Sequence, residues 1–313
     1  MKTHRTSPAK RGFTLMELMV AMAITTIIVT VLVSITSIAL DTWNRSRAEL
    51  RAARQGKTMV DSMARDFESL VTRRGNTNEW LSAITPTASL PKVKNTESSN
   101  ACELSFFTAA TDRYNGQIGT TTDKGGDVSC ASYLLEGKDP IAGGSGKFDT
   151  FVLNRLLVNP DETFNQLLGK PDLAAAFDTY DAGKTKRKLP ENFVCENIYQ
   201  FSITFHVQVS KIVNSVSTLI DVPITVGDSA SSKEFRIQGS GLIVDSNAKL
   251  PNNVVVADLK AGRLTAVEIS LTVVSDFGID QLRARSDLTG TKQAEFLAKN
   301  SYQYTKLVQV PSM

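Results

Sequence analysis

Few residues of this chain could carry out covalent chemistry, and they do not form a known catalytic pattern. The only histidines are His4 and His206. The sequence contains no G-x-S-x-G nucleophile elbow, no H-E-x-x-H zinc motif, no phosphate-binding P-loop and no G-x-G-x-x-G dinucleotide motif. A Ser-His or Cys-His mechanism would have His206 as its candidate base, and nothing in the sequence places a nucleophile beside it. We therefore expect no enzyme activity and no catalytic residues.

The cysteines and acidic residues give little indication of a metal or a cofactor. Cys102, Cys130 and Cys195 form no C-x-x-C pair, which argues against a zinc site. In an oxidising compartment two of them could form a disulfide, with Cys102–Cys130 the favoured pair, and three buried thiols are the equal alternative. The segment Asp123–Asp127 (DKGGD) could bind calcium, but it lacks the ligand spacing of a known calcium loop. Loop Asp and Gly residues more often form turns, so we expect no metal and no cofactor there.

The positive charge of the chain is concentrated at its start. The formal net charge is +3, and the first twelve residues alone contribute four positive charges. The rest of the chain has 31 basic and 32 acidic residues, which predicts no nucleic-acid partner. The basic segment Lys184–Lys188 (KTKRK) is interpreted as a solvated loop, and contact with an anionic surface or DNA is the less favoured alternative.

Glu17 is the one charged residue in a long apolar run. Residues Phe13–Leu40 form 28 residues without Gly or Pro. At about 1.5 Å per residue, a helix of this length exceeds the ~30 Å hydrocarbon core of a bilayer. Its hydroxyl side chains are tolerable because they can bond back to helix carbonyls. Basic residues precede the run, so the N-terminus should stay cytoplasmic and the rest of the chain should be exported.

Two simpler interpretations of this run are a cleaved secretory signal peptide and a plain signal anchor. A signal peptide would have a shorter apolar core followed by a small-x-small cleavage site. A signal anchor fits the hydropathy but does not explain Glu17. A carboxylate in a membrane segment costs about 2.5–3.5 kcal/mol on insertion scales, so it is expected to have a partner or a function.

The residues Arg11–Glu17 (RGFTLME) resemble the prepilin processing motif of type IV pilins and type II secretion pseudopilins. The resemblance implies that a prepilin peptidase in the membrane cuts after Gly12 and methylates the new amine of Phe13. It implies assembly with other pilin-like subunits through the N-terminal helix. Glu17 of one subunit would neutralise the amine of its neighbour, since either charge alone is costly in an apolar core. Many major pilins have a bending proline midway along this helix, where this chain has Ser34.

The second half of the expected helix is amphipathic. From Asp41 to about Thr72, apolar residues recur at spacings of three, four and seven, which predicts one helical face packed on a sheet. Gly56 is the one glycine that interrupts this segment, and Arg73–Asn76 end it plausibly. The apolar face consists of Trp43, Leu50, Ala53, Val60, Met63, Phe67 and Val71.

After Gly75 the pattern changes to short runs that are typical of strands, with His206 on an exposed strand face. The resulting fold class is α+β: a long N-terminal helix packed on an antiparallel, β-rich domain. The organisation is a basic leader (1–12), a transmembrane or filament-core helix (13–40), an amphipathic stalk helix (41–74) and an exported globular domain (75–313). Strands are expected at Leu104–Thr108, Cys130–Leu135, Phe151–Val158, Ile198–Val209, Ser217–Val222, Phe235–Val244 and Val267–Val274, and short helices at Glu162–Leu168, Gln281–Ser286 and Thr291–Lys299.

The order of these pieces resembles the larger minor pseudopilins, most of all the J-type of type II secretion, and also a pilin-like protein of multi-gene cassettes in Verrucomicrobia. This implies a minor pilin or pseudopilin that assembles into, or caps, a type IV pilus or type II secretion-like filament. The expected location is the inner membrane, with a single pass and a periplasmic C-terminal domain, and then the filament. The alternatives are a major, self-polymerising pilin and a ligand-binding domain or enzyme that uses a pilin-type anchor.

Overall fold

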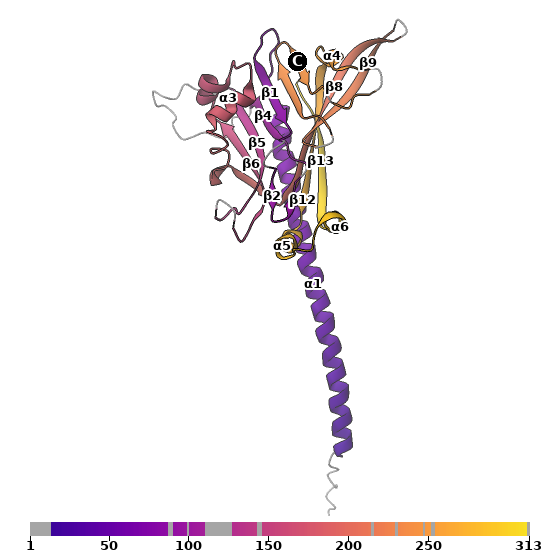
Figure 1. Ribbon diagram of the computed structural model, residues 1–313. Coiled ribbons are helices and arrows are strands. Elements are labelled where there is room, and N and C mark those ends of the chain that lie inside the picture. The colour runs from indigo at the N-terminus through magenta and orange to yellow at the C-terminus, as the bar shows by residue number, and fades with distance from the viewer. Residues whose placement is uncertain are drawn as a thin grey trace, which may run out of the picture. The chain divides into compact units, whose positions relative to one another are not determined.

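The computed structural model describes residues 14–86, 90–98, 100–109, 127–142, 146–213, 216–228, 231–246, 248–251 and 254–311. The chain divides into two compact units, Met1–Ala48 and Glu49–Met313. The first unit consists, in its described part, of the N-terminal portion of helix α1 (Leu15–Glu68). The second unit contains the rest of α1, two antiparallel sheets and the shorter helices (Figure 1).

The larger sheet has seven strands, and every neighbouring pair in it is antiparallel. Helix α3 (Leu173–Tyr180) contacts β1 and β4, and a π-helical turn at Thr163–Leu167 contacts β5. Both faces of the central strands are therefore covered, which is why β6 is buried along its whole length. The strand order is β11 (Gly241–Val244), β10 (Glu234–Gln238), β1 (Glu79–Ile84), β4 (Glu103–Thr108), β5 (Ser129–Lys138), β6 (Thr150–Val158) and β7 (Phe193–Glu196).

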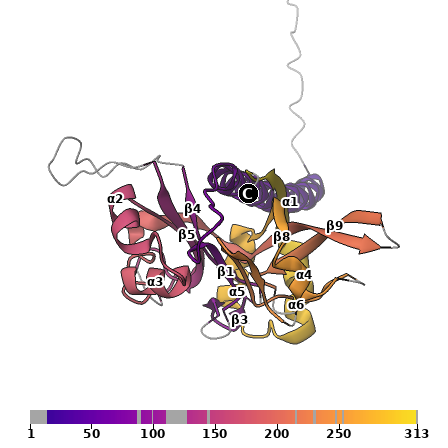
Figure 2. The same cartoon turned by 90° about the horizontal axis from the view of Figure 1, so that it is seen from above.

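The smaller sheet has four strands, and its central strands show the alternation of a half-covered sheet. In β8, Phe201, Ile203, Phe205 and Val207 are buried, while the residues between them are partly exposed. Figure 2 shows α2 and α3 beside β4 and β5, with the β8–β9 hairpin at the other end of the unit. The order is β13 (Ser301–Gln309), β12 (Arg263–Val274), β8 (Ile198–Val213) and β9 (Val216–Val226).

The remaining elements are short. They are the hairpin of β2 (Lys92–Val93) and β3 (Thr96–Glu97), helix α2 (Pro160–Glu162), a 3-10 turn at Pro190–Asn192, and helices α4 (Val256–Leu259), α5 (Asp276–Ala284) and α6 (Gly290–Asn300).

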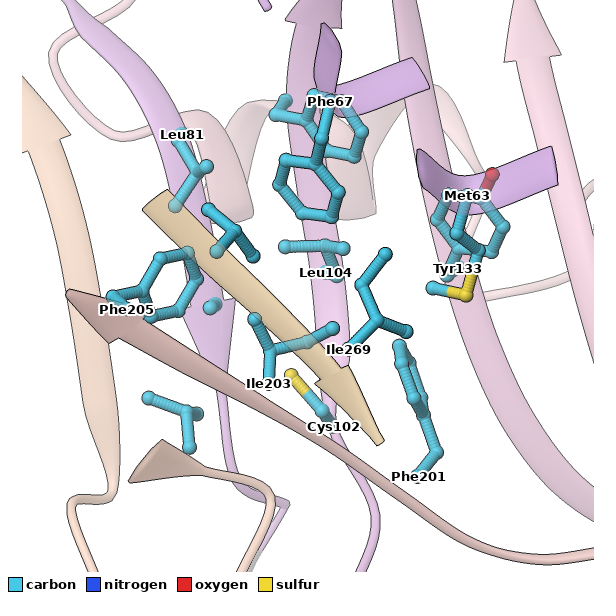
Figure 3. Close-up of a cluster of buried hydrophobic side chains, with 14 of the residues drawn as sticks. Met63, Phe67, Leu81, Cys102, Leu104, Tyr133, Phe201, Ile203, Phe205 and Ile269 are labelled. Carbon is cyan, nitrogen blue, oxygen red and sulfur yellow. The ribbon is translucent and has the colours of Figure 1, made fainter. Parts of the chain in front are cut away.

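The core of the second unit lies where the C-terminal part of α1 meets both sheets. Figure 3 shows Met63 and Phe67 of α1 among apolar side chains from β1, β4, β5, β8 and β12. The ring of Phe67 stacks on Phe106 with centroids 4.5 Å apart. Gly56 lets the helix approach the smaller sheet, because a Cβ atom at this position would lie 2.4 Å from Cδ2 of Tyr304 on β13. The same helix face therefore packs on both sheets.

The expected fold class is confirmed: a long N-terminal helix with an apolar stretch precedes an antiparallel, β-rich domain. Several boundaries differ, and two of the differences have a clear local cause. Helix α1 ends at Glu68, because Leu70 forms a bridge with Thr108 and the amide of Val71 donates to the carbonyl of Phe107 at 2.9 Å. The run Phe235–Val244 is a hairpin, β10–β11, and Gly241 follows its turn at a φ of 134° that favours glycine.

The apolar face of the stalk is also shifted from its expected position. Leu50 is 58% exposed and Trp43 is exposed, whereas Ala52, Gly56 and Met59 are buried. From Val60 onward the expected and observed faces coincide at Met63 and Phe67.

Cys102, Cys130 and Cys195 are free and buried, which matches the alternative of three buried thiols and not the Cys102–Cys130 disulfide. The register explains the absence of this bridge. Cys130 on β5 lies opposite Phe107 on β4, five residues beyond Cys102. At about 3.3 Å per residue, the two cysteines are roughly 16 Å apart along the strands, whereas a disulfide requires Cα atoms within about 7 Å.

Candidate functional site

The carboxylate of Glu17 caps the start of its own helix. One of its oxygens accepts hydrogen bonds from the backbone amide of Thr14 at 2.9 Å and from the Thr14 hydroxyl at 3.0 Å. In return, the amide of Glu17 donates to the Thr14 hydroxyl at 3.2 Å. This reciprocal pattern is a capping box, which satisfies backbone donors that a helix start leaves free. The expected cleavage and methylation residues, Gly12 and Phe13, lie outside the described residues.

The capping box places the acid at the first turn of a helix whose surface is apolar and exposed. Side chains from Leu15 (78% exposed) to Leu40 (57% exposed) have no covering partner in the first unit. The helix is long and apolar enough to cross a membrane, and none of its most apolar window is buried. A contiguous apolar surface of this extent requires lipid or protein around it.

Five hydroxyl groups of this apolar segment bond within the helix, as expected. Each hydroxyl donates to the carbonyl four residues earlier, at 2.7–2.9 Å, and so needs no hydrogen-bond acceptor outside the helix. The donors are Thr25, Thr26, Thr30, Ser34 and Thr36. Glu17 is the one ionisable side chain between Leu15 and Leu40.

In the second unit, a buried ion pair fixes α1 to the larger sheet. Arg155 on β6 donates to both carboxylate oxygens of Asp66, each at 2.8 Å, and the Tyr133 hydroxyl donates to one of them. Tyr133 and Arg155 face each other on β5 and β6, so one acid of the helix binds a cross-strand pair. Burial, and after it the negative charge of Asp66, raise the pKa of Tyr133, which keeps the phenol protonated as a donor. The sequence contains no signal for this network, because a charged residue such as Asp66 is expected on the polar face of an amphipathic helix.

Near the start of the second unit, Arg51 of α1 forms a second and more exposed set of ion pairs. Its guanidinium binds Glu196 of β7 at 2.8 Å and Asp276 of α5 at 3.2 Å. Asp276 also accepts from the Asn197 amide at 2.7 Å. Such exposed pairs contribute little energy individually, but they join α1 to β7 and to α5.

The basic segment Lys184–Lys188 differs from the expected solvated loop at Arg187, whereas Thr185 and Lys188 are exposed. Arg187 is buried, where its guanidinium binds Asp181 and, at 3.0 Å, Asp178. Its guanidinium carbon also lies 5.0 Å from the centre of the Phe177 ring. Lys184 pairs with Glu103. Asp178 of α3, Asp181 directly after α3 and Glu103 of β4 thus pair with Arg187 and Lys184 of this segment.

Glu79 is a buried acid that the sequence analysis did not single out. Its carboxylate accepts from the amide of Leu173, the first residue of α3, at 2.7 Å, and lies 3.6 Å from Nη1 of Arg236. Burial raises the pKa of Glu79 to about 7, against the opposing effect of the Leu173 hydrogen bond. Glu79 is the first residue of β1, an interior strand of the larger sheet, and its carboxylate caps the start of α3.

No catalytic set was found among the described residues. His206 lies on the outer face of β8, with Nδ1 2.9 Å from Asp221 and Nε2 3.8 Å from Glu268, beside no nucleophile. The described part of the chain contains no group of three or more His, Cys, Asp or Glu residues that could hold a metal ion. The calcium candidate Asp123–Asp127 falls outside the described residues except for Asp127.

Comparison with known proteins gives one match. Residues 7–33 match the family model described as the prokaryotic N-terminal methylation motif. No curated protein and no solved structure matches the chain. The matched residues include Lys10 and Arg11, the Gly12–Phe13 junction, the capping box and the first part of the apolar helix. The chain therefore carries the N-terminus of a prepilin-type substrate of prepilin peptidase, which supports its place among the type IV pilin-like proteins.

Proposed function

We propose that this chain is a minor pilin or pseudopilin, a low-copy subunit that assembles into, or caps, a filament of the type IV pilus or type II secretion kind. Prepilin peptidase cleaves after Gly12 and methylates Phe13. The helix first anchors the protein in the inner membrane, with the β-rich domain in the periplasm, and later packs among the helices of other pilin-like subunits. The protein is not an enzyme.

The observation that carries this proposal is the combination at the start of α1. A methylation motif at residues 7–33 leads into a helix with a fully exposed apolar surface and a single carboxylate, Glu17, in its first turn. A plain membrane anchor has no need for that acid, whose burial in lipid is unfavourable. Cleavage after Gly12 would create an amine one residue before Thr14, within reach of a neighbouring subunit's Glu17 carboxylate.

The size of the second unit supports a minor rather than a major role. It comprises Glu49–Met313 and includes two sheets and a projecting β8–β9 hairpin. Repeating this bulk at every step of a thin helical fibre would crowd the surface, whereas a few copies at one end have room. A filament in which this chain is the most abundant protein would indicate the alternative, a major pilin.

Intact mass of the membrane-extracted protein tests the processing step. We expect a mature chain that starts at Phe13 and carries one additional methyl group. A chain that starts at Met1, or after Leu40, would contradict the pilin assignment.

Two variants of Glu17 separate its charge from its capping role. Glu17→Gln keeps a capping-box side chain and removes the charge, while Glu17→Leu removes both. If the acid neutralises a neighbour's amine, both variants should insert normally in the membrane and both should fall in filament content, measured by mass spectrometry. Normal incorporation of Glu17→Gln would show that the residue acts only as a cap.

A further inference from the structure

The chain enters the second unit at one particular end of it, where α1 meets α5. Arg51, near the start of this unit, binds Asp276, the first residue of α5, at 3.2 Å. Asp276 also accepts a hydrogen bond from the Asn197 amide at 2.7 Å. Asn197 in turn accepts from the hydroxyl of Thr150, the first residue of β6, at 2.6 Å. The start of α5 and the start of β6 therefore lie together at this end, which we call the entry end.

Three large apolar side chains are exposed at the entry end. Phe277, the second residue of α5, is 48% exposed, and Phe148, two residues before β6, is 45% exposed. Ile141, in the turn after β5, is 81% exposed, more than any other large apolar side chain described in the second unit. Single exposed apolar residues are common on protein surfaces, so the argument depends on how these three are held and where they lie.

A single buried carboxylate fixes the backbone on which two of them stand. Asp139 is buried, and it accepts hydrogen bonds from the amides of Ile141 at 2.9 Å, Ala142 at 3.1 Å and Phe148 at 2.9 Å. Gly146 lies so close to this carboxylate that a Cβ atom there would clash with it. Ile141 and Phe148 are therefore presented to solvent from a fixed backbone, although burying them elsewhere would be favourable.

Cationic side chains lie beside the ring of Phe148. The ammonium group of Lys147 is 5.5 Å from the ring centre, and the guanidinium carbon of Arg283, on α5, is 5.8 Å from it. Apolar side chains accompanied by Lys and Arg are typical of surfaces that lie in a membrane interface. There the rings enter the headgroup layer, and the long cationic side chains extend toward the phosphates.

The entry end is also the end to which the apolar run is attached. Eleven residues lead from Leu40, the last residue of that run, to Arg51. As a helix, this length spans about 16 Å, and the headgroup layer accounts for roughly 5–8 Å of it. The remaining distance of about 10 Å can be closed by a tilted helix and protruding side chains. A bilayer that holds the apolar run is therefore within reach of the entry end.

We infer that Ile141, Phe148 and Phe277 insert into the headgroup layer of the phospholipid bilayer that anchors the N-terminal helix. This inference rests on the membrane stage of the proposed function. It adds an interfacial contact, made by the second unit, to the transmembrane one. Lipid is the occupant because the entry end is joined by a short stretch of chain to the membrane segment, and because its side chains match the boundary between acyl chains and phosphates. Extraction into a filament would then have to break both contacts.

The test uses the full-length chain reconstituted in vesicles of phosphatidylethanolamine and phosphatidylglycerol that contain a phospholipid with a photoreactive acyl chain. After illumination, mass spectrometry locates the lipid adducts along the chain. The test variant is Ile141→Ser with Phe148→Ser. Its matched control is Leu219→Ser with Phe164→Ser, which also removes one aliphatic and one aromatic side chain, 63% and 69% exposed, from other parts of the second unit.

We expect the wild type to carry adducts at α5 and beside Phe148 as well as on the apolar run. The test variant should lower the adduct yield at α5 about tenfold, because two apolar side chains no longer enter the interface. The control should leave this yield unchanged. Ile141→Leu with Phe148→Trp should retain it, because both new side chains suit a membrane interface. Higher salt should change it little, because burial of apolar surface carries the contact.

Adducts confined to the apolar run of the wild type would overturn the inference and leave the proposed function intact. An unchanged yield at α5 in the test variant would also refute it. Protection of α5 from hydrogen exchange without lipid adducts would assign the entry end to a second copy of the chain instead. A chain without adducts even on the apolar run has not entered the bilayer, which would count against the proposed function as well.

Discussion

Removal of the Asp66 charge should strongly destabilise the second unit. Asp66 is 2% exposed and accepts both hydrogen bonds of the Arg155 guanidinium and that of the Tyr133 phenol. Asp66→Asn leaves the guanidinium buried without an opposite charge. Breaking one side of a buried ion pair costs about 3–5 kcal/mol. For a unit of this size, that loss corresponds to a decrease of about 6–20 °C in Tm.

The loss can be measured on a fragment that starts near Asp41. This fragment retains all of the second unit and omits most of the exposed apolar helix, so we expect it to fold as a monomer. Urea unfolding followed by far-UV circular dichroism gives the free energy of unfolding, and an unchanged m-value shows that the same surface is exposed. Asp61→Asn is the matched control, because Asp61 pairs with Lys306 at the surface and should cost less than about 1 kcal/mol.

A triple variant separates the cost of leaving Arg155 unpaired from the net stability that the polar network contributes. Asp66→Leu, Arg155→Met and Tyr133→Phe together replace the polar groups by apolar ones of similar size. This variant should come within about 1–2 kcal/mol of the wild type, because a buried pair contributes little net stability against a well-packed apolar replacement. A loss of less than about 1 kcal/mol in Asp66→Asn would refute the reasoning. A triple variant as unstable as the single one would show that packing sets the cost.

Three further outcomes are expected. Gly56→Ala should destabilise the unit by about 1–2 kcal/mol, because overpacking against Tyr304 outweighs the gain of about 1 kcal/mol in helix propensity, and a cycle with Tyr304→Ala should remove that penalty. Glu79 has a folded pKa near 7, above its ordinary 4.5, so between these pH values the folded state binds a proton that the unfolded state does not. The wild type should therefore lose stability as pH rises from about 4.5 to 7, and urea midpoints of Glu79→Gln should lack this loss. Thiol titration without reductant should count three thiols, reactive only after denaturation, because burial raises the pKa of each, to about 12 for Cys195; a count of one would contradict this.

Local patterns predicted the elements whose residues follow one clear period. The alternation in Ile198–Val209 and Val267–Val274 anticipated β8 and β12, and the apolar run anticipated the first part of α1. Strand β1 was missed because it is buried on both faces and so does not alternate. The edge strand β13 was missed because most of its side chains are at least partly exposed.

The contacts that fix α1 to the body could not be predicted, because they join residues far apart in the chain. Asp66 lies 67 and 89 residues from its partners Tyr133 and Arg155. Likewise, the sequence around Arg187 shows a basic run, and only the packing of α3 shows that Asp178 and Asp181 neutralise it. A local signal was present in one case: the Thr14-x-x-Glu17 spacing is a capping box, and the membrane context drew attention to the charge instead.

The hydroxyl groups of the apolar helix have a consequence for how the protein changes surroundings. Thr25, Thr26, Thr30, Ser34 and Thr36 satisfy their hydroxyl donors with carbonyls of their own helix. They therefore require nothing from lipid and nothing from a neighbouring helix, and a move from one apolar environment to the other breaks no polar bond along this stretch. These hydroxyl groups therefore give no preference between lipid and an apolar protein surface. Glu17, at one end of the segment, is the group whose free energy would differ between the two environments.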